Sequence, residues 1–84
     1  MAKIIMYSTA ACPYCERARQ LLVRKNQLFT EIRVDEMPEK REEMIAKSNR
    51  RTVPQIFIDG QAIGGCDDLY ALESSGQLDN LLKG

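Results

Sequence analysis

The chain is 84 residues long, with 44% hydrophobic residues, 29% charged residues and a formal net charge of zero at pH 7. This length and composition predict one globular domain over residues 1–84. Residues 1–54 carry 11 Lys and Arg against 7 Asp and Glu, whereas residues 55–84 carry 1 against 5. Because nucleic-acid-binding proteins are usually basic overall, the balanced total argues against a nucleic-acid partner.

The sequence also argues against a membrane or secreted protein. No apolar run approaches the roughly 20 residues of a membrane-spanning helix, and the N-terminal MAKIIMY lacks the long apolar region of a signal peptide. There are three cysteines and no histidine, an odd count that is not typical of a secreted disulfide framework. We therefore expect a cytoplasmic protein, with no membrane partner, in which any disulfide is transient and chemical.

The first 34 residues predict a strand–helix–strand unit. Residues 3–7 (KIIMY) form a short apolar run, typical of a central strand covered on both faces. A helix is predicted from Pro13 to about Lys25, since proline suits the first helical position. Its apolar face consists of Cys15, Ala18, Leu21 and Leu22. Residues 30–34 alternate in polarity, which predicts a half-exposed strand joined to the first by a right-handed parallel crossover.

The next segments predict a helix and a hairpin. Residues 38–48 form the helix, highly charged at its start and apolar at Met44 and Ile45. Two short strands at residues 55–58 and 61–63 flank the dipeptide Asp59-Gly60. Both positions of this dipeptide tolerate a positive φ, which favours a two-residue hairpin turn.

Helical segments complete the predicted fold. Residues 67–74 begin with Asp67 and Asp68, where the helix dipole favours acids, and Gly76 lies just beyond their end. Residues 77–82 add one more turn. The order strand–helix–strand, helix, strand–strand–helix predicts an α/β, thioredoxin-like fold, with a mixed four-stranded sheet and helices on both faces.

Cys12 and Cys15 are the candidate reactive residues. Three positions apart at the start of a helix, they lie on the same side, so their sulfurs can meet without much backbone movement. Cys12 faces the unpaired N–H groups and the positive end of the helix dipole, which favour its thiolate. Cys15, one turn inside, is expected to be less exposed and less acidic. Cys12 is therefore the predicted nucleophile and Cys15 the resolving thiol.

Three other interpretations of the pair were weighed. Two inert, buried small residues are disfavoured by the strand before them and the helix after them. A structural zinc site needs four Cys or His ligands, more than this chain supplies, so no metal is expected. An iron–sulfur cluster shared by two chains needs only one cysteine from each chain plus added thiols, and it remains an alternative.

Several motifs resemble the glutaredoxin family, in particular its small bacterial dithiol members of the glutaredoxin 3 type. They are CPYC after the first strand, TVP at residues 52–54 and GGCDDL at residues 64–69. With REEMI (41–45) and VPQIFIDG (53–60), the resemblance covers essentially the whole chain. CPYC alone is moderately specific, whereas its combination with the other two motifs is highly specific.

The resemblance implies a groove for glutathione. Val53 would pair with it through the backbone, Pro54 would follow a cis peptide bond, and Cys66 and Asp67 would receive its γ-glutamyl end, since helix N-termini bind carboxylates. Arg51 would lie toward its glycyl carboxylate. The residues carried over as glutathione-binding are Tyr14, Arg51, Thr52, Val53, Pro54, Gly65, Cys66 and Asp67, with Gln55 or Arg50 as further candidates for the glycyl end.

Some of these residues also have plainer interpretations. TVP could be only the entry to a strand, Asp67 an ordinary helix cap, and the two arginines a solvated loop. Cys66 could be a small residue packed at a helix start, or a third thiol open to glutathionylation.

Thr9 departs from the family pattern. Many glutaredoxins carry a lysine three residues before the nucleophile, where it contacts the glycyl carboxylate and stabilises the thiolate. Thr9 occupies that position here. We expect weaker glutathione affinity and a less acidic Cys12 than in lysine-bearing relatives.

The implied activity is that of a glutathione-dependent thiol–disulfide oxidoreductase. It would reduce protein–glutathione mixed disulfides through Cys12 alone and protein disulfides through Cys12 and Cys15 together. Its partners would be glutathione and glutathionylated or disulfide-bonded proteins, a class that includes ribonucleotide reductase, and the chain is expected to be a monomer. The alternatives are a redoxin reduced by thioredoxin reductase and a glutathione-ligated iron–sulfur carrier.

Overall fold

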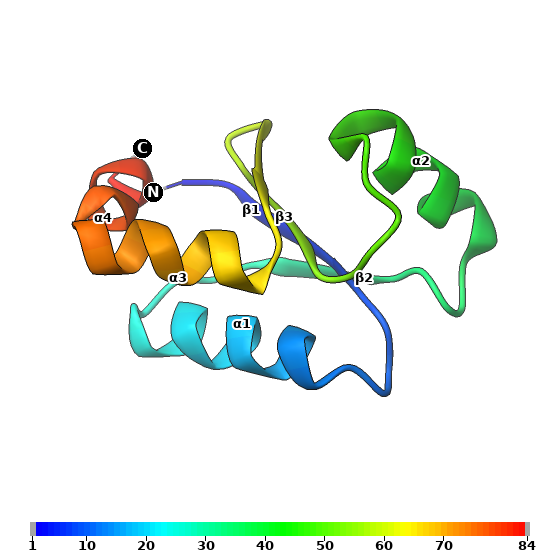
Figure 1. The fold of residues 1–84 in the computed structure, drawn as a ribbon, viewed down its shortest axis with the longest axis horizontal. Coiled ribbons are helices and arrows are strands. Elements are labelled where there is room, and N and C mark those ends of the chain that lie inside the picture. Colours follow the sequence, from blue (N-terminus) through cyan, green and yellow to red (C-terminus); the bar gives the residue numbers. More distant parts are fainter. Residues whose placement is uncertain (1, 84) are drawn as a thin grey trace.

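A four-stranded sheet forms the centre of the computed structural model, which describes residues 2–83 (Figure 1). The strands are β1 (Ile4–Ser8), β2 (Thr30–Arg33), β3 (Gln55–Ile58) and β4 (Gln61–Gly64). The helices are α1 (Pro13–Arg24), α2 (Pro38–Ser48), α3 (Cys66–Ser75) and α4 (Gln77–Leu82). This order confirms the predicted sequence of elements.

The sheet is mixed, as predicted, with the strand order β2-β1-β3-β4. β1 pairs in parallel with β2, while β1 with β3 and β3 with β4 are antiparallel. The parallel pair is possible because α1 supplies the crossover between its two strands. The chain leaves β1 at Ser8 and enters the loop that carries Cys12.

The two faces of β1 are buried against different helices, which accounts for its continuous apolar sequence. Ile4 and Met6 belong to the larger core cluster, together with residues of α1, α3 and α4. Tyr7 belongs to the smaller cluster on the other face, with Met44 of α2. Its ring packs edge-on against Phe57, with the ring centroids 5.6 Å apart. Figure 1 shows α1 and α3 side by side, with α2 apart from them.

The β3–β4 turn has the predicted geometry. Asp59 and Gly60 both adopt positive φ, at 51° and 83°. The Asp59 side chain also holds the residue before β1, because its Oδ1 accepts a hydrogen bond from the Lys3 backbone N–H at 2.8 Å. The predicted two-residue hairpin is confirmed.

Two predicted boundaries near residue 65 differ by one residue from the structure. β4 extends to Gly64 instead of Ile63, and α3 begins at Cys66 instead of Asp67. Gly64 has φ of +113°, and a Cβ there would lie 2.3 Å from Asp68 Oδ2. Glycine thus lets the end of β4 approach the first turn of α3, a contact that local sequence patterns do not reveal.

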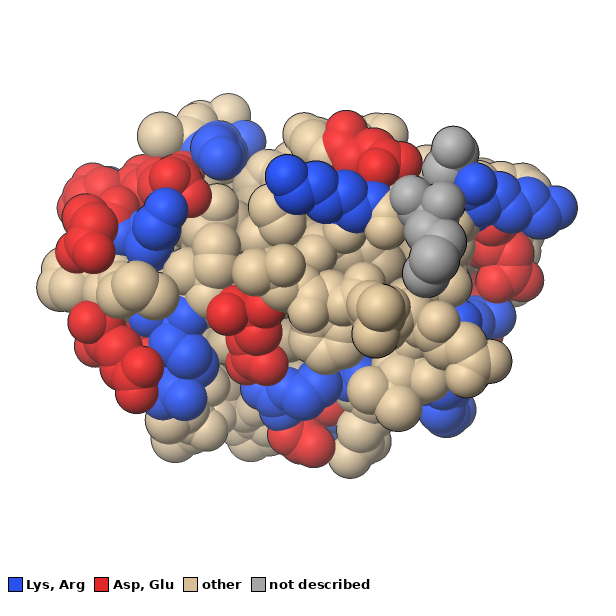
Figure 2. Space-filling model, turned by 180° about the vertical axis from the view of Figure 1, so that it is seen from behind, with Lys and Arg blue, Asp and Glu red and all other residues tan. Residues whose placement is uncertain are grey.

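Ion pairs join the basic first part of the chain to the acidic last part. Lys25 Nζ lies 2.7 Å from Glu73 Oε1 and 3.0 Å from Asp79 Oδ1, and Arg50 pairs with Asp68 at 2.8 Å. The face in Figure 2 accordingly shows both signs of charge interspersed. No helix within residues 2–83 is long and apolar enough to cross a membrane.

Candidate active site

The two cysteines of CPYC occupy different environments at the start of α1. Cys12 is the N-cap residue, with extended backbone, and its Sγ accepts a hydrogen bond from the Cys15 N–H at 3.1 Å. Cys12 is partly exposed, whereas Cys15 is completely buried. The arrangement places one sulfur at the positive end of the helix, within reach of solvent. It agrees with the exposure expected from the spacing.

Burial makes two of the thiols less acidic. It raises the pKa of Cys15 to about 12, together with the hydrogen bond to Cys12. A backbone hydrogen bond from Thr9 and the charge of Arg19 act in the opposite direction. The pKa of Cys66 is raised by burial and by the negative charge of Asp67. The expectation that Cys15 is poorly acidic is thus supported by its surroundings.

The TVP loop, residues 52–54, contacts Cys12 through Val53. The Cys12 thiol donates to the Val53 carbonyl oxygen across 3.8 Å, and the Val53–Pro54 peptide bond is cis, as the family resemblance implies. Gln55 is buried and its Nε2 donates to the Thr52 carbonyl at 3.0 Å and to the Thr52 hydroxyl at 3.3 Å. Gln55 therefore shapes this loop from within.

A groove of about 310 Å³ lies between the TVP loop and α3. Cys12 is not among its lining residues, but Val53, whose carbonyl oxygen is 3.8 Å from Cys12 Sγ, lines it. The groove brings together most of the residues that the sequence predicted as glutathione-binding. Its lining residues are Tyr14, Arg50, Thr52, Val53, Pro54, Gly65, Cys66, Asp67 and Asp68. A larger depression of about 510 Å³ lies between β4, α3 and α4, but no cysteine lines it.

Besides the buried Gln55, Arg51 is the predicted contact that does not line the groove. It is exposed, and its carbonyl oxygen accepts from Arg41 Nη2 at 3.1 Å. Arg50, which the sequence offered only as a further candidate, lines the groove instead. Adjacent arginines in a loop cannot be ranked from sequence, since their order follows from the backbone path.

Asp68 is a groove residue that sequence reasoning assigned only to the helix dipole. Its Oδ2 accepts from the Gly65 N–H at 2.9 Å and from Arg50 Nη1 at 2.8 Å. These two contacts lower the pKa of Asp68. Asp68 lies at N3, three residues after the N-cap Gly65, where an acidic side chain can accept from the N-cap N–H, a signal that could have indicated the contact.

Tyr14 forms the outer edge of the groove. Its ring is 54% exposed, and the Arg17 guanidinium lies over it, 5.7 Å from the ring centroid. This contact holds a large, exposed aromatic surface next to Cys12.

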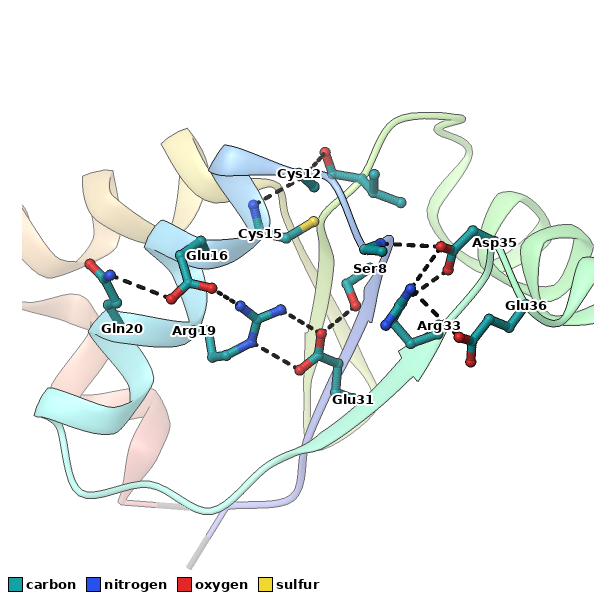
Figure 3. A network of polar contacts seen from close by, with 12 residues as sticks. Ser8, Cys12, Cys15, Glu16, Arg19, Gln20, Glu31, Arg33, Asp35 and Glu36 are labelled. Carbon is teal, nitrogen blue, oxygen red and sulfur yellow. Dashed lines mark hydrogen bonds and ion pairs between the residues drawn. The ribbon is translucent and has the colours of Figure 1, made fainter.

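A polar network lies beneath the cysteines and was not predicted. It connects Ser8, Arg19 and Glu31, and Figure 3 shows it next to Cys15. Nearby, Asp35 accepts from the Ala10 N–H at 3.2 Å and pairs with Arg33, which lowers the pKa of Asp35 to about 2. The Ala10 contact anchors the loop before Cys12. These pairs join segments that are distant in the sequence, so no local sequence pattern predicts them.

Comparisons with known proteins agree with this geometry. Residues 4–63 match the family model described as Glutaredoxin. The chain is 58% identical over 83 residues to Glutaredoxin 3 of Escherichia coli (strain K12), covering 99% of this chain and 100% of that protein. Its fold is similar to the solution structure of a Brucella melitensis glutaredoxin, with a TM-score of 0.87, 54% identity and coverage of 99% and 90% of the two chains.

A solved glutaredoxin–glutathione complex from buckwheat is also similar in fold. It has a TM-score of 0.90 and 27% identity, with coverage of 98% of this chain and 77% of that chain.

Proposed function

Because the chain belongs to the glutaredoxin family, it is a thiol–disulfide oxidoreductase that uses glutathione, and we propose that Cys12 is its nucleophile and Cys15 its resolving thiol. The observation that carries this assignment is the asymmetry at the start of α1. Cys12 Sγ is partly exposed and accepts the Cys15 N–H, whereas Cys15 is buried with a raised pKa. Only the thiolate attacks, so the accessible sulfur at the helix N-terminus is the better nucleophile.

Reduction of a protein–glutathione mixed disulfide needs Cys12 alone. Its thiolate attacks the glutathione sulfur, a new disulfide forms between Cys12 and glutathione, and the electron pair of the broken bond leaves with the protein thiol. A second glutathione thiolate then attacks the glutathione sulfur bound to Cys12. The products are glutathione disulfide and the free Cys12 thiolate.

Reduction of a protein disulfide uses both thiols. Cys12 attacks first and forms a mixed disulfide with one substrate cysteine, releasing the other. Cys15 then attacks the Cys12 sulfur, which closes a Cys12–Cys15 disulfide and releases the second substrate thiol. Glutathione reduces this disulfide and completes the cycle.

Glutathione binds in the groove beside Cys12. The Val53 backbone pairs with its cysteinyl unit, and the N-terminal amides of α3, at Cys66 and Asp67, receive its γ-glutamyl carboxylate. The Asp67 carboxylate pairs with its ammonium group. Arg50, which pairs with Asp68 at 2.8 Å, supplies a positive charge at the start of α3, beside the γ-glutamyl carboxylate. The contact of Arg51 with the glycyl carboxylate stays a prediction. Tyr14, Thr52, Pro54 and Gly65 shape the walls.

The proteins that it reduces are glutathionylated or disulfide-bonded, and the cytoplasm is the proposed compartment. A dithiol that must return to its reduced form requires a reducing pool such as glutathione. The similarity of the fold to a buckwheat glutaredoxin–glutathione complex supports the ligand. We expect the chain to act as a monomer.

Three single variants test the roles. Cys15→Ser should still reduce a glutathionylated peptide but lose reduction of a protein disulfide, whereas Cys12→Ser should lose both activities. Ser74→Ala is the control, because Ser74 is an exposed residue of α3 that does not line the groove, and it should retain both. Activity retained by Cys12→Ser would overturn the assignment of the nucleophile.

A further inference from the structure

The network beneath Cys15 fixes a guanidinium in place (Figure 3). Arg19 donates from Nε to Oε1 of Glu31 at 3.0 Å and from Nη2 to Oε2 at 2.6 Å. Ser8 Oγ donates to the same Oε2 at 2.5 Å. Ser8 is completely buried, and the side chains of Arg19 and Glu31 are 30% and 25% exposed. The Glu31 carboxylate, which Ser8 of β1 contacts, thus orients Arg19 through two hydrogen bonds.

Arg19 is placed to act on Cys15. It follows Cys15 by four residues on α1, so both side chains lie on the same helix face. Its positive charge lowers the pKa of Cys15, opposing the effects of burial and of the charge on Cys12. A cation in a partly buried site is screened less by water than one on the open surface.

Other charged groups lie around Arg19. Glu31 and Arg33 lie on β2, and Glu16 pairs with Arg19 from the outer side of α1. Within residues 2–83, the charged groups that act directly on the Cys15 thiol are Cys12 and Arg19. When Cys12 is part of a mixed disulfide it carries no charge, so Arg19 is then the charge that remains.

We propose that Arg19, held by Glu31 and Ser8, is a positioning residue for the resolving step, in which its charge stabilises the Cys15 thiolate. This proposal rests on the proposed roles of Cys12 and Cys15. Cys12 lies at the N-terminus of α1, next to the free backbone amides, whereas Cys15 lies one turn inside the helix. Arg19 would supply the stabilising charge that Cys15 lacks. The first step, attack by Cys12, does not depend on it.

The step balances without another reagent. Cys15 loses its proton to water, and its thiolate attacks the Cys12 sulfur of the mixed disulfide. The Cys12–Cys15 bond forms as the bond to the substrate sulfur breaks. The electron pair leaves with the substrate sulfur, which takes up a proton. Cys15 is oxidised, the substrate cysteine is reduced, and Cys12 stays in a disulfide throughout the step.

A neutral chromogenic disulfide, 4,4′-dithiodipyridine, separates the two steps. In a Cys66→Ser background, attack by Cys12 releases one thiopyridone and resolution by Cys15 releases a second, and stopped-flow absorbance records both phases from pH 5 to pH 10. Arg19→Gln should leave the first phase within twofold. It should shift the pH profile of the second phase upward by about one unit. At pH 7 the second phase should slow about three- to fourfold, because a more basic thiolate is also a better nucleophile.

Matched variants isolate the charge. Arg19→Lys, which keeps a cation at this position, should restore most of the second phase and its pH profile. Arg24→Gln removes the same charge from an exposed position of α1 and should change neither phase. A second phase in Arg19→Gln with unchanged rate and pH profile would overturn the proposal.

Two further variants serve as controls for misfolding and for the source of the second thiopyridone. If circular dichroism shows that Arg19→Gln does not fold, the double variant Arg19→Gln/Glu31→Gln removes both partners of the ion pair. The double variant should show the same selective slowing of the second phase. An unchanged second phase in this variant would again overturn the proposal. Cys15→Ser should release only the first thiopyridone. A second release from Cys15→Ser would overturn the proposed function itself, whereas its loss with an unaffected Arg19→Gln would overturn only the role of Arg19.

Discussion

At the scale of single residues, the three thiols of the chain differ mainly in their contact with solvent. Cys12 is partly exposed, while Cys15 and Cys66 are 0% and 5% exposed. Burial raises the pKa of both hidden thiols. We therefore expect attack to begin at Cys12, the accessible thiol.

Thr9 is the residue at which a gain of function is expected. By the family resemblance, Thr9→Lys would bring a cation to the Cys12 sulfur and to the glycyl carboxylate, so it should lower KM for glutathione about two- to tenfold. It should also speed alkylation of Cys12 by iodoacetamide at pH 6. Steady-state kinetics and mass-resolved alkylation measure the two effects.

Ala10→Lys is the control for this gain. Ala10 is the exposed neighbour of Thr9, so the variant adds the same charge to the same loop. It should change KM less than twofold. Equal effects of the two variants, or no effect of Thr9→Lys, would show that position 9 has no special relation to the ligand.

At the scale of elements, the junction between β4 and α3 shapes the groove. Gly64→Ala forces a Cβ to within 2.3 Å of Asp68 Oδ2 and places alanine at φ of +113°. The carboxylate then loses its contacts with Gly65 and Arg50. We expect a loss of about 2 kcal/mol in the free energy of unfolding, from backbone strain and loss of the cap, and a higher KM for glutathione.

Gly76→Ala separates these two causes. Gly76 also has positive φ, at 82°, but a Cβ there meets nothing within 4 Å. It should cost about 1 kcal/mol of stability, measured by urea denaturation, with no change in KM. A Gly64→Ala protein that binds glutathione normally would refute the role of this junction.

The elements themselves were largely predictable, because local physics determines them. The buried face of α1, the apolar run of β1 and the positive φ values at Asp59 and Gly60 follow from periodicity and turn chemistry. The cysteine pair and its asymmetry follow from helix geometry. These features depend on residues no more than a few positions apart.

The features that the sequence did not reveal join distant segments. Arg19 meets Glu31 from 12 residues away, and Arg50 meets Asp68 from 18 residues away. Charged residues of these kinds have many equivalent partners on the surface, and only the completed fold selects one. The cis Val53–Pro54 bond came from family resemblance, since backbone preferences alone favour trans.

At the scale of the whole molecule, two core clusters on opposite faces of one sheet provide the stability. A chain of this size has a net free energy of unfolding of roughly 4 to 13 kcal/mol. Leu78, in the short helix α4, is completely buried in the larger cluster. Leu78→Ala should therefore cost about 2–5 kcal/mol by urea denaturation, a large share of the total.

Leu28→Ala is the matched control, because Leu28 is 81% exposed. It should change stability by less than about 0.5 kcal/mol. A similarly small effect of Leu78→Ala would mean that α4 is not part of the cooperative core.

The central claim, that Cys12 is the sulfur that carries glutathione, is tested most directly by trapping the intermediate. The Cys15→Ser protein is incubated with glutathione disulfide, digested without reduction, and analysed by mass spectrometry. We predict one glutathione per chain, attached to Cys12, that free glutathione removes. Glutathione found on Cys66 with Cys12 unmodified would contradict it.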